Sequence, residues 1–99
     1  MNGVSLLKCI CNDVRFEILD LLQKNKEMCV NDFVYKLKKD QPLVSHHLKT
    51  LKSCGIVKSR EEGKKAMYSI SNNQLSELIV NITKVSKKIP VLCNDNICC

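Results

Sequence analysis

Apolar residues recur at intervals of three and four along most of the chain, and they alternate with polar residues in one short stretch. The first spacing is that of an amphipathic helix, and the second is that of a half-buried strand. Alternation at Ala66, Tyr68 and Ile70 predicts a strand that pairs with another starting at Ile56. Helices are predicted near residues 5–10, 13–24, 31–37, 42–53 and 73–89, and the short apolar run 28–30 predicts a further strand.

Residues at the ends of these segments support the predicted boundaries. Asn12 and Asn31 are good N-caps, because an asparagine side chain accepts hydrogen bonds from the free N–H groups of a first helical turn. Pro42 fits the first position of its helix, where a missing N–H costs nothing. Gly55 is a natural left-handed terminator for the same helix, and Gly63 lies in the turn between the two strands.

The predicted order is helix, helix, short strand, helix, helix, hairpin, helix. Two short helices joined by a tight turn and followed by a basic hairpin describe a winged helix-turn-helix. The fold is therefore expected to be mostly α with a small β-hairpin, in one domain over residues 1–90 with a cysteine-rich tail over 91–99. Because 99 residues make a small core, a homodimer would bury further apolar surface. The first and last helices would supply this interface and part of the core through Leu6, Leu7, Ile10, Leu75, Leu78, Ile79 and Ile82.

Residues 41–60 carry the clearest indication of function, with four basic residues and no acidic one. One face of the predicted helix is apolar, at Val44, Leu48 and Leu51, while the other presents side chains that can meet base edges and phosphates. On the hairpin a charge run is usually only a solvated face, but here it follows a helix of recognition type. The candidate DNA contacts are Gln41, Ser45, His46, Lys49 and Lys52 on the helix and Arg60, Lys64 and Lys65 on the hairpin.

The whole chain is basic, with a formal net charge of +6 at pH 7. This charge favours an anionic partner, either a nucleic acid or a membrane surface. No stretch is long and apolar enough to span a bilayer, and the N-terminal residues lack the basic start and small-residue cleavage site of a signal peptide. We therefore expect a cytoplasmic protein that binds double-stranded DNA rather than a membrane.

Two segments of the chain resemble a known family, the ArsR/SmtB metalloregulators. The recognition helix and wing of that family typically read SQPxVSxHLxxLxxxGLVxxRxxGxxxxYxL, and this chain reads QPLVSHHLKTLKSCGIVKSREEGKKAMYSI. Upstream, ICNDVRFEILDLL looks like the LADPTRLRILxLL segment of the family, so the matches together cover most of residues 9–71. The resemblance implies a homodimeric repressor that binds a palindromic operator and is released by a metal or metalloid ion.

The usual metal-binding positions of that family are only partly filled here. One variety of the family uses two cysteines in an ELCVCDL motif, whereas this chain reads EMCVNDF, so that Cys29 is kept and Asn31 replaces the second thiolate. Another variety binds zinc through His and carboxylate residues of the last helix, where this chain has no His and only Glu77. By this resemblance, neither of these two sites is expected.

Three of the seven cysteines, Cys93, Cys98 and Cys99, lie within seven residues at the end of the sequence. Soft thiolates select thiophilic ions, and three sulfurs without a histidine or carboxylate suit a three-coordinate ion such as As(III) or Sb(III), whereas zinc would want a fourth ligand. The trio also resembles the C-terminal cysteines of some arsenic-responsive members of the ArsR/SmtB family. We expect these residues to bind the inducer, the alternative being a tail with incidental thiols.

Cys9 and Cys11 form a second cluster. In some ArsR/SmtB members, N-terminal cysteines join those of the partner subunit to bind Cd(II) or Pb(II), and here they could meet Cys29 or the other protomer's tail. The simpler alternative is that Cys9 packs as a small hydrophobe, since residues two apart on a helix do not share a face. Cys54, beside Gly55 at the helix end, is expected to be structural.

Other classes of function compete with a metal-released repressor. The thiols could form a redox switch, through a disulfide between Cys98 and Cys99 or between Cys9 and a tail cysteine. A metal store or metallochaperone would use the cysteines but leave the basic helix and hairpin unexplained. An enzyme is not expected, because the chain has no glycine-rich phosphate loop, no nucleophile beside a plausible base and no paired carboxylates in a pocket pattern.

Overall fold

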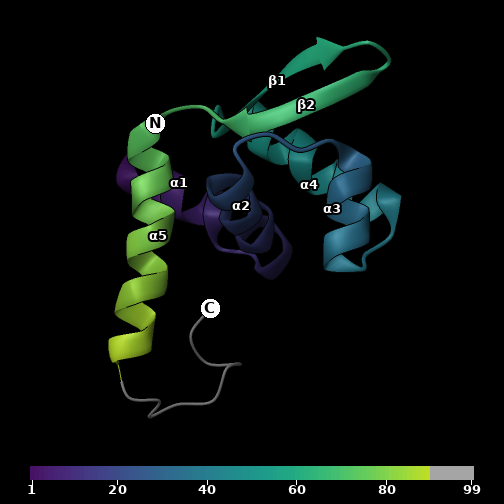
Figure 1. The fold of residues 1–99 in the computed structure, drawn as a ribbon. Coiled ribbons are helices and arrows are strands. Elements are labelled where there is room, and N and C mark those ends of the chain that lie inside the picture. The colour runs from purple at the N-terminus through teal and green to yellow at the C-terminus, as the bar shows by residue number, and fades with distance from the viewer. Residues whose placement is uncertain (90–99) are drawn as a thin grey trace.

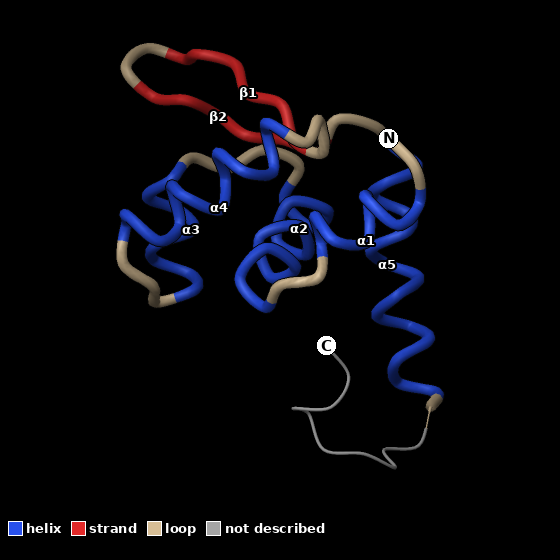
Figure 2. The backbone as a smooth tube through the Cα atoms, turned by 180° about the vertical axis from the view of Figure 1, so that it is seen from behind, coloured by secondary structure: helices blue, strands red, loops and turns tan. Residues whose placement is uncertain are grey.

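The computed structural model describes residues 1–89, so Cys93, Cys98 and Cys99 lie outside the described residues. Figure 1 shows α2 at the centre, with α3 and α4 on one side, α5 on the other and the hairpin across one end, and Figure 2 shows the same arrangement from behind. The predicted winged helix-turn-helix, mostly α with one small hairpin, is confirmed. Over residues 1–89 the elements are α1 (Gly3–Ile10), α2 (Asp13–Asn25), α3 (Val30–Leu37), α4 (Gln41–Ser53), β1 (Val57–Glu62), β2 (Lys65–Ile70) and α5 (Asn73–Lys88).

The core lies around α2, which contacts α4, α5 and β2. Its fully buried side chains come from α2, α3, α4, α5 and the residue before β1, because each amphipathic helix turns its apolar face inward. Each buried aliphatic side chain contributes roughly 1.5–3 kcal/mol, so the inner face of α4 alone holds that helix firmly. The fully buried side chains are Ile18, Leu19, Leu22, Phe33, Val44, Leu48, Leu51, Ile56 and Ile79. None of the helices described over residues 1–89 is long and apolar enough to cross a bilayer.

The start of α2 is capped as the sequence predicts, but the start of α3 is not. Asn12 Oδ1 accepts hydrogen bonds from the N–H groups of Val14 and Arg15, at 3.0 and 3.2 Å. The prediction that Asn31 caps α3 is wrong, because the N-cap is Cys29 and Asn31 is already inside the helix. The Cys29 N–H donates to Asp32 Oδ2 at 3.1 Å, the half of a capping box in which the carboxylate at the third helical position reaches back.

The strand predicted over 28–30 is reduced to one residue. Met28 forms an isolated antiparallel bridge with Tyr68, with N–H···O distances of 3.0 and 2.8 Å, while Cys29 and Val30 already belong to the start of α3. The early cap at Cys29 turns the chain into the helix and leaves only Met28 free to pair. Pro42 is the second residue of α4 rather than the first, a position whose N–H also has no partner within the helix.

The end of α4 and the hairpin follow the predicted turn chemistry. Gly55 has φ +80° after the last turn of α4, and Gly63 has φ +64° between the strands, both in the region that favours glycine. The two strands pair antiparallel along their whole length. Ser71 Oγ donates to the Gly55 carbonyl at 2.7 Å, so the base of the hairpin is tied to the end of α4.

Candidate nucleic-acid interface

The helix α4 separates an apolar inner face from a polar outer face. Its inner side chains belong to the core, and α3 packs against it to complete the helix-turn-helix. The turn between the two helices is made at Lys38, which adopts a left-handed φ of +56°. All five side chains predicted to contact DNA from this helix lie on its accessible side. Gln41, His46, Lys49 and Lys52 are exposed and Ser45 is half-buried.

His47 is buried, unlike the neighbouring His46, and the two rings meet edge to face with their centroids 5.2 Å apart. His47 is 8% exposed, and its Nδ1 is buried without a hydrogen-bond partner among the described residues. Burial, and then the nearby charges of Arg15 and His46, lower the pKa of His47. The imidazole is therefore held neutral at pH 7 and acts as a packing group.

A buried histidine with a lowered pKa makes stability depend on pH. The unfolded chain takes up a proton near its ordinary pKa of about 6.5, whereas folded His47 does so only at lower pH, so the free energy of unfolding falls as pH drops through this window. Each unit between the two pKa values is worth about 1.4 kcal/mol. Urea unfolding between about pH 5 and 8 measures the slope. His47→Leu should flatten it, His46→Leu should not, and an unchanged slope in His47→Leu would contradict the assignment.

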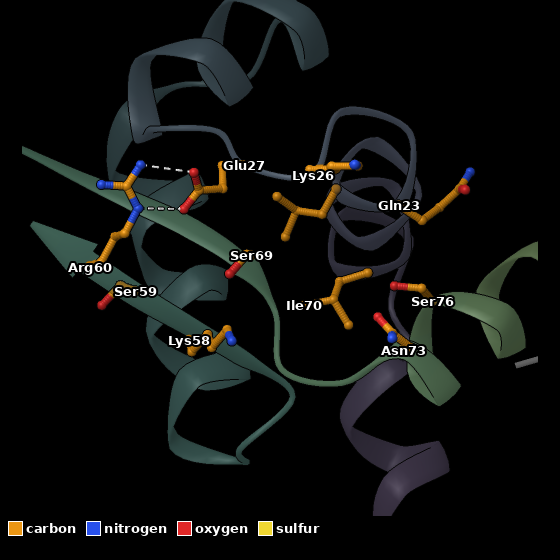
Figure 3. Close-up of a pocket in the computed structure, with 11 residues that line it drawn as sticks. Gln23, Lys26, Glu27, Lys58, Ser59, Arg60, Ser69, Ile70, Asn73 and Ser76 are labelled. Carbon is orange, nitrogen blue, oxygen red and sulfur yellow. Dashed lines mark hydrogen bonds and ion pairs between the residues drawn. The ribbon is translucent and has the colours of Figure 1, made fainter. Parts of the chain in front are cut away.

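The predicted hairpin contacts divide into two groups. Lys64 and Lys65 are exposed at the tip. Arg60 instead turns its guanidinium toward Glu27, in the segment between α2 and α3 (Figure 3). Its Nε donates to Glu27 Oε2 at 2.7 Å and its Nη2 to Glu27 Oε1 at 2.9 Å, and Nη2 also lies 3.2 Å from Glu62 Oε2. Arg60 thus has two carboxylate partners inside the protein.

The pair of Arg60 and Glu27 was not predicted from the sequence, because the two residues are 33 positions apart. The hydrogen bond from Arg60 lowers the pKa of Glu27, so this carboxylate stays charged at physiological pH. A phosphate that binds Arg60 must compete with a fixed bidentate carboxylate, the geometry in which arginine binds anions best. DNA contact by Arg60 stays a prediction.

A groove of about 740 Å³ lies between the hairpin, the end of α2 and the start of α5 (Figure 3). Lys26, Lys58 and Arg60 line it, with Glu27 as the acidic member. Lys26 has φ +66°, and the N–H of the next residue donates to the Asn25 carbonyl at 2.8 Å, which closes a tight turn at this point.

Removal of the Glu27 carboxylate should strengthen DNA binding. Glu27→Gln frees the Arg60 guanidinium for a phosphate, so we expect several-fold higher duplex affinity and a salt dependence steeper by about one contact. Fluorescence anisotropy at several salt concentrations measures both. The matched control is Glu61→Gln. It also removes one negative charge, but from a residue of the hairpin that is not among the carboxylate partners of Arg60, which are Glu27 and Glu62. Equal effects from the two variants would mean that net charge, not release of Arg60, changes the affinity.

The cysteines within residues 1–89 occupy different environments. Cys29 is buried at the start of α3, Cys11 is exposed, and Cys9 and Cys54 are half-buried against the core. The structural packing expected for Cys54 is confirmed. In this part of the chain no group of three or more His, Cys, Asp or Glu residues is placed to hold a metal ion. A site that Cys9, Cys11 and Cys29 share between two protomers stays a prediction.

A helix-turn-helix whose second helix has a polar, basic outer face, followed by a basic hairpin, defines the winged-helix class of transcriptional regulators. The model of the bacterial regulatory protein arsR family matches residues 12–59. Over 77 residues the chain is 43% identical to the HTH-type transcriptional regulator MJ1325 of Methanocaldococcus jannaschii, covering 78% of this chain and 86% of that protein. The chain therefore belongs to the ArsR family, whose members are transcriptional regulators rather than enzymes.

Two regulators of Staphylococcus aureus are each 33% identical to this chain. One is an arsenical resistance operon repressor, with 83% of this chain and 78% of that protein covered. The other is a homolog of the cadmium resistance regulator CadC, with 80% and 65% covered. Among solved structures, the homodimeric winged helix-turn-helix domain Mb0332 of Mycobacterium bovis matches with a TM-score of 0.75 and 28% identity, covering 89% of this chain and 92% of that one.

Proposed function

We propose that this chain is a homodimeric repressor that binds a palindromic DNA operator and is released when As(III) or Sb(III) binds its cysteine thiolates. The observation that carries the DNA-binding part is the outer face of α4, where polar and basic side chains lie on a helix held by a fully buried inner face. Such a helix fits the major groove, where its side chains meet base edges and phosphates.

Apolar side chains left exposed on α1 and at the end of α5 support a dimer. Ile10 and Ile79, which the sequence assigned to core and interface alike, are buried within the protomer. The related Mb0332 domain is a homodimer, which supports dimerisation of this chain. Two protomers joined in this way would present their α4 helices to major grooves about one helical turn apart. Near the two ends of residues 1–89, the exposed apolar side chains are Met1, Val4, Leu7, Val85 and Ile89.

The choice of inducer rests on the chemistry of the thiols. The arsenical and cadmium regulators of Staphylococcus aureus are equally similar to this chain, so likeness alone favours neither ion. Three thiolates at Cys93, Cys98 and Cys99 suit As(III) or Sb(III). The alternatives are Cd(II) or Pb(II) bound by Cys9, Cys11 and Cys29 across the dimer, and a thiol-redox switch. For any of these ions to release the DNA, the ion must bind the DNA-free geometry of the dimer more tightly than the DNA-bound geometry. Equal binding to both geometries would release nothing.

Selection of duplexes from a random pool, using the whole chain reduced with a phosphine, tests the proposal. A phosphine is preferred because a dithiol reductant would compete for As(III). We expect an enriched palindrome, an affinity that falls linearly with salt on logarithmic axes, and release by As(III) or Sb(III). Lys49→Ala on α4 should lower affinity and reduce the salt slope by about one, whereas Lys84→Ala on α5 should not. Failure to prefer any duplex at low salt would overturn the proposal.

A further inference from the structure

The groove between the hairpin, the end of α2 and the start of α5 is not used by the proposed function. Within residues 1–89 it is lined by three cationic side chains and one carboxylate, and its volume of about 740 Å³ falls in the range of roughly 300–1,000 Å³ typical of small-molecule sites. We propose that this groove binds a small organic dicarboxylate, which acts as an effector of the repressor separate from the thiols. Binding of the dicarboxylate does not depend on the proposed function, whereas its effect on DNA rests on it.

Two of the cationic side chains in the groove have no counterion. Arg60 and Glu27 neutralise each other through hydrogen bonds of 2.7 and 2.9 Å. Lys26 and Lys58 are exposed, and neither forms an ion pair with another residue of the described chain. Two ammonium groups without a partner attract a ligand with two negative charges, and a molecule with a carboxylate at each end supplies them.

Local structure holds the two lysines on separate walls of the groove. Lys26 is the C-cap of α2 and has a left-handed φ of +66°, so the chain turns sharply there. Lys58 lies on β1 directly opposite Ser69 on β2, and the side chains of two opposite residues share one face of a hairpin. Figure 3 shows the two lysines apart, one at the end of α2 and the other on the hairpin. Two anionic groups joined by a short carbon chain match this separation better than two charges on a single phosphate.

The uncharged lining of the groove suits the rest of such a ligand. Leu22 and Ile70 provide apolar surface for a chain of methylene groups. The hydroxyls of three half-buried serines can donate to carboxylate oxygens, and none of these hydroxyls has a hydrogen-bond partner within residues 1–89. The three serines are Ser59, Ser69 and Ser76. An apolar surface with a few polar groups that fix orientation is the usual composition of a small-molecule site.

A dicarboxylate in this groove would oppose DNA binding through its charge. Lys58 is two residues from Arg60 on β1, in the hairpin that the proposed function places against DNA. The bound ligand cancels positive charge that attracts DNA phosphates. Coupling between two binding sites is reciprocal, so a ligand that weakens operator binding is itself bound less tightly by the DNA complex. This difference in affinity between the free and the DNA-bound protein is what makes the ligand an effector.

NMR titration of the full-length, ¹⁵N-labelled and phosphine-reduced protein tests binding in the absence of DNA. The probes are succinate, glutarate and adipate at constant ionic strength, with butyrate as the matched acid that has one carboxylate and glycerol 3-phosphate as the dianion with both charges on one group. At least one dicarboxylate should shift the amide signals of residues on both walls of the groove. Its dissociation constant should be at least about tenfold lower than that of butyrate, and also lower than that of glycerol 3-phosphate.

Replacement of the two lysines should remove this binding. Lys26→Gln/Lys58→Gln keeps the length of the side chains but not their charge, so the dissociation constant of the dicarboxylate should rise at least about tenfold. The matched control is Lys87→Gln/Lys88→Gln, which removes two charges from exposed residues at the other end of α5. It should leave the dissociation constant unchanged. The amide spectra of both variants check that they are folded.

The outcomes separate this inference from the proposed function. No shift at the groove, equal binding of butyrate, or equal loss in both double variants would overturn the site, and tighter binding of glycerol 3-phosphate would overturn the assignment of a dicarboxylate. At saturation the ligand should raise the operator dissociation constant at least about fivefold in the unmodified protein and not in Lys26→Gln/Lys58→Gln. Unchanged operator affinity would overturn the effect on DNA. If the protein prefers no duplex, the proposed function fails, while the NMR titration still decides whether the groove binds the dicarboxylate.

Discussion

Replacement of Cys93, Cys98 and Cys99 with serine should leave operator binding intact and abolish release by As(III). The positions lie outside the helix and hairpin expected to touch DNA, so the reduced, ion-free protein should bind as before. Serine keeps the size of cysteine but offers no soft thiolate, so the ion loses its ligands. Coupling between two sites is usually about 5- to 150-fold, and we expect the unmodified protein to lose operator affinity in this range and the triple variant to lose none.

Anisotropy titrations at fixed operator concentration measure this difference, with the three single variants beside the triple one. Each single variant should need more As(III) for release, because two thiolates bind a three-coordinate ion less well than three. Cys11→Ser serves as the matched control, since it removes one thiol from outside the trio. If the triple variant still leaves its operator normally when As(III) is added, the tail is not the site, and Cys9, Cys11 and Cys29 become the candidates.

The parts of the fold that could be predicted depend on signals close together in the sequence. Asn12 caps the helix that follows it, and Gly55 and Gly63 take the positive φ values that their turns require. The outer face of α4 could also be predicted from the sequence, because polar positions opposite an apolar stripe must face away from the core. Each of these needs only a few residues of context.

The parts that could not be predicted depend on residues far apart in the sequence. Arg60 appeared to be a free cation for DNA, but Glu27, 33 positions away, holds it by two hydrogen bonds. The cap of α3 is an intermediate case, because the spacing of Cys29 and Asp32 fits a capping box but Asn31 is the better cap by residue type.

Leu7→Glu should convert the dimer to monomers and remove most of the operator affinity. Leu7 is 59% exposed on α1, and Leu and Glu have similar helix propensities, so the protomer should fold normally. A glutamate in the interface would bury a charge without a partner, which costs far more than the lost apolar contact. Without the dimer the two α4 helices are no longer linked, so each protomer binds its half-site independently and affinity should fall by about 10²–10⁴-fold. Sedimentation velocity and anisotropy measure the two effects.

The matched control for this variant is Tyr35→Glu, which places the same charge on an exposed apolar position of α3. Tyr35 is 82% exposed, and α3, which carries it, lies on the opposite side of α2 from α5 (Figure 1), so its replacement should leave the dimer intact. Loss of the dimer in both variants would indicate a general effect of charge rather than an interface at α1. A Leu7→Glu protein that sediments as a dimer would rule out this surface, and the two α4 helices would then have to be joined through another face.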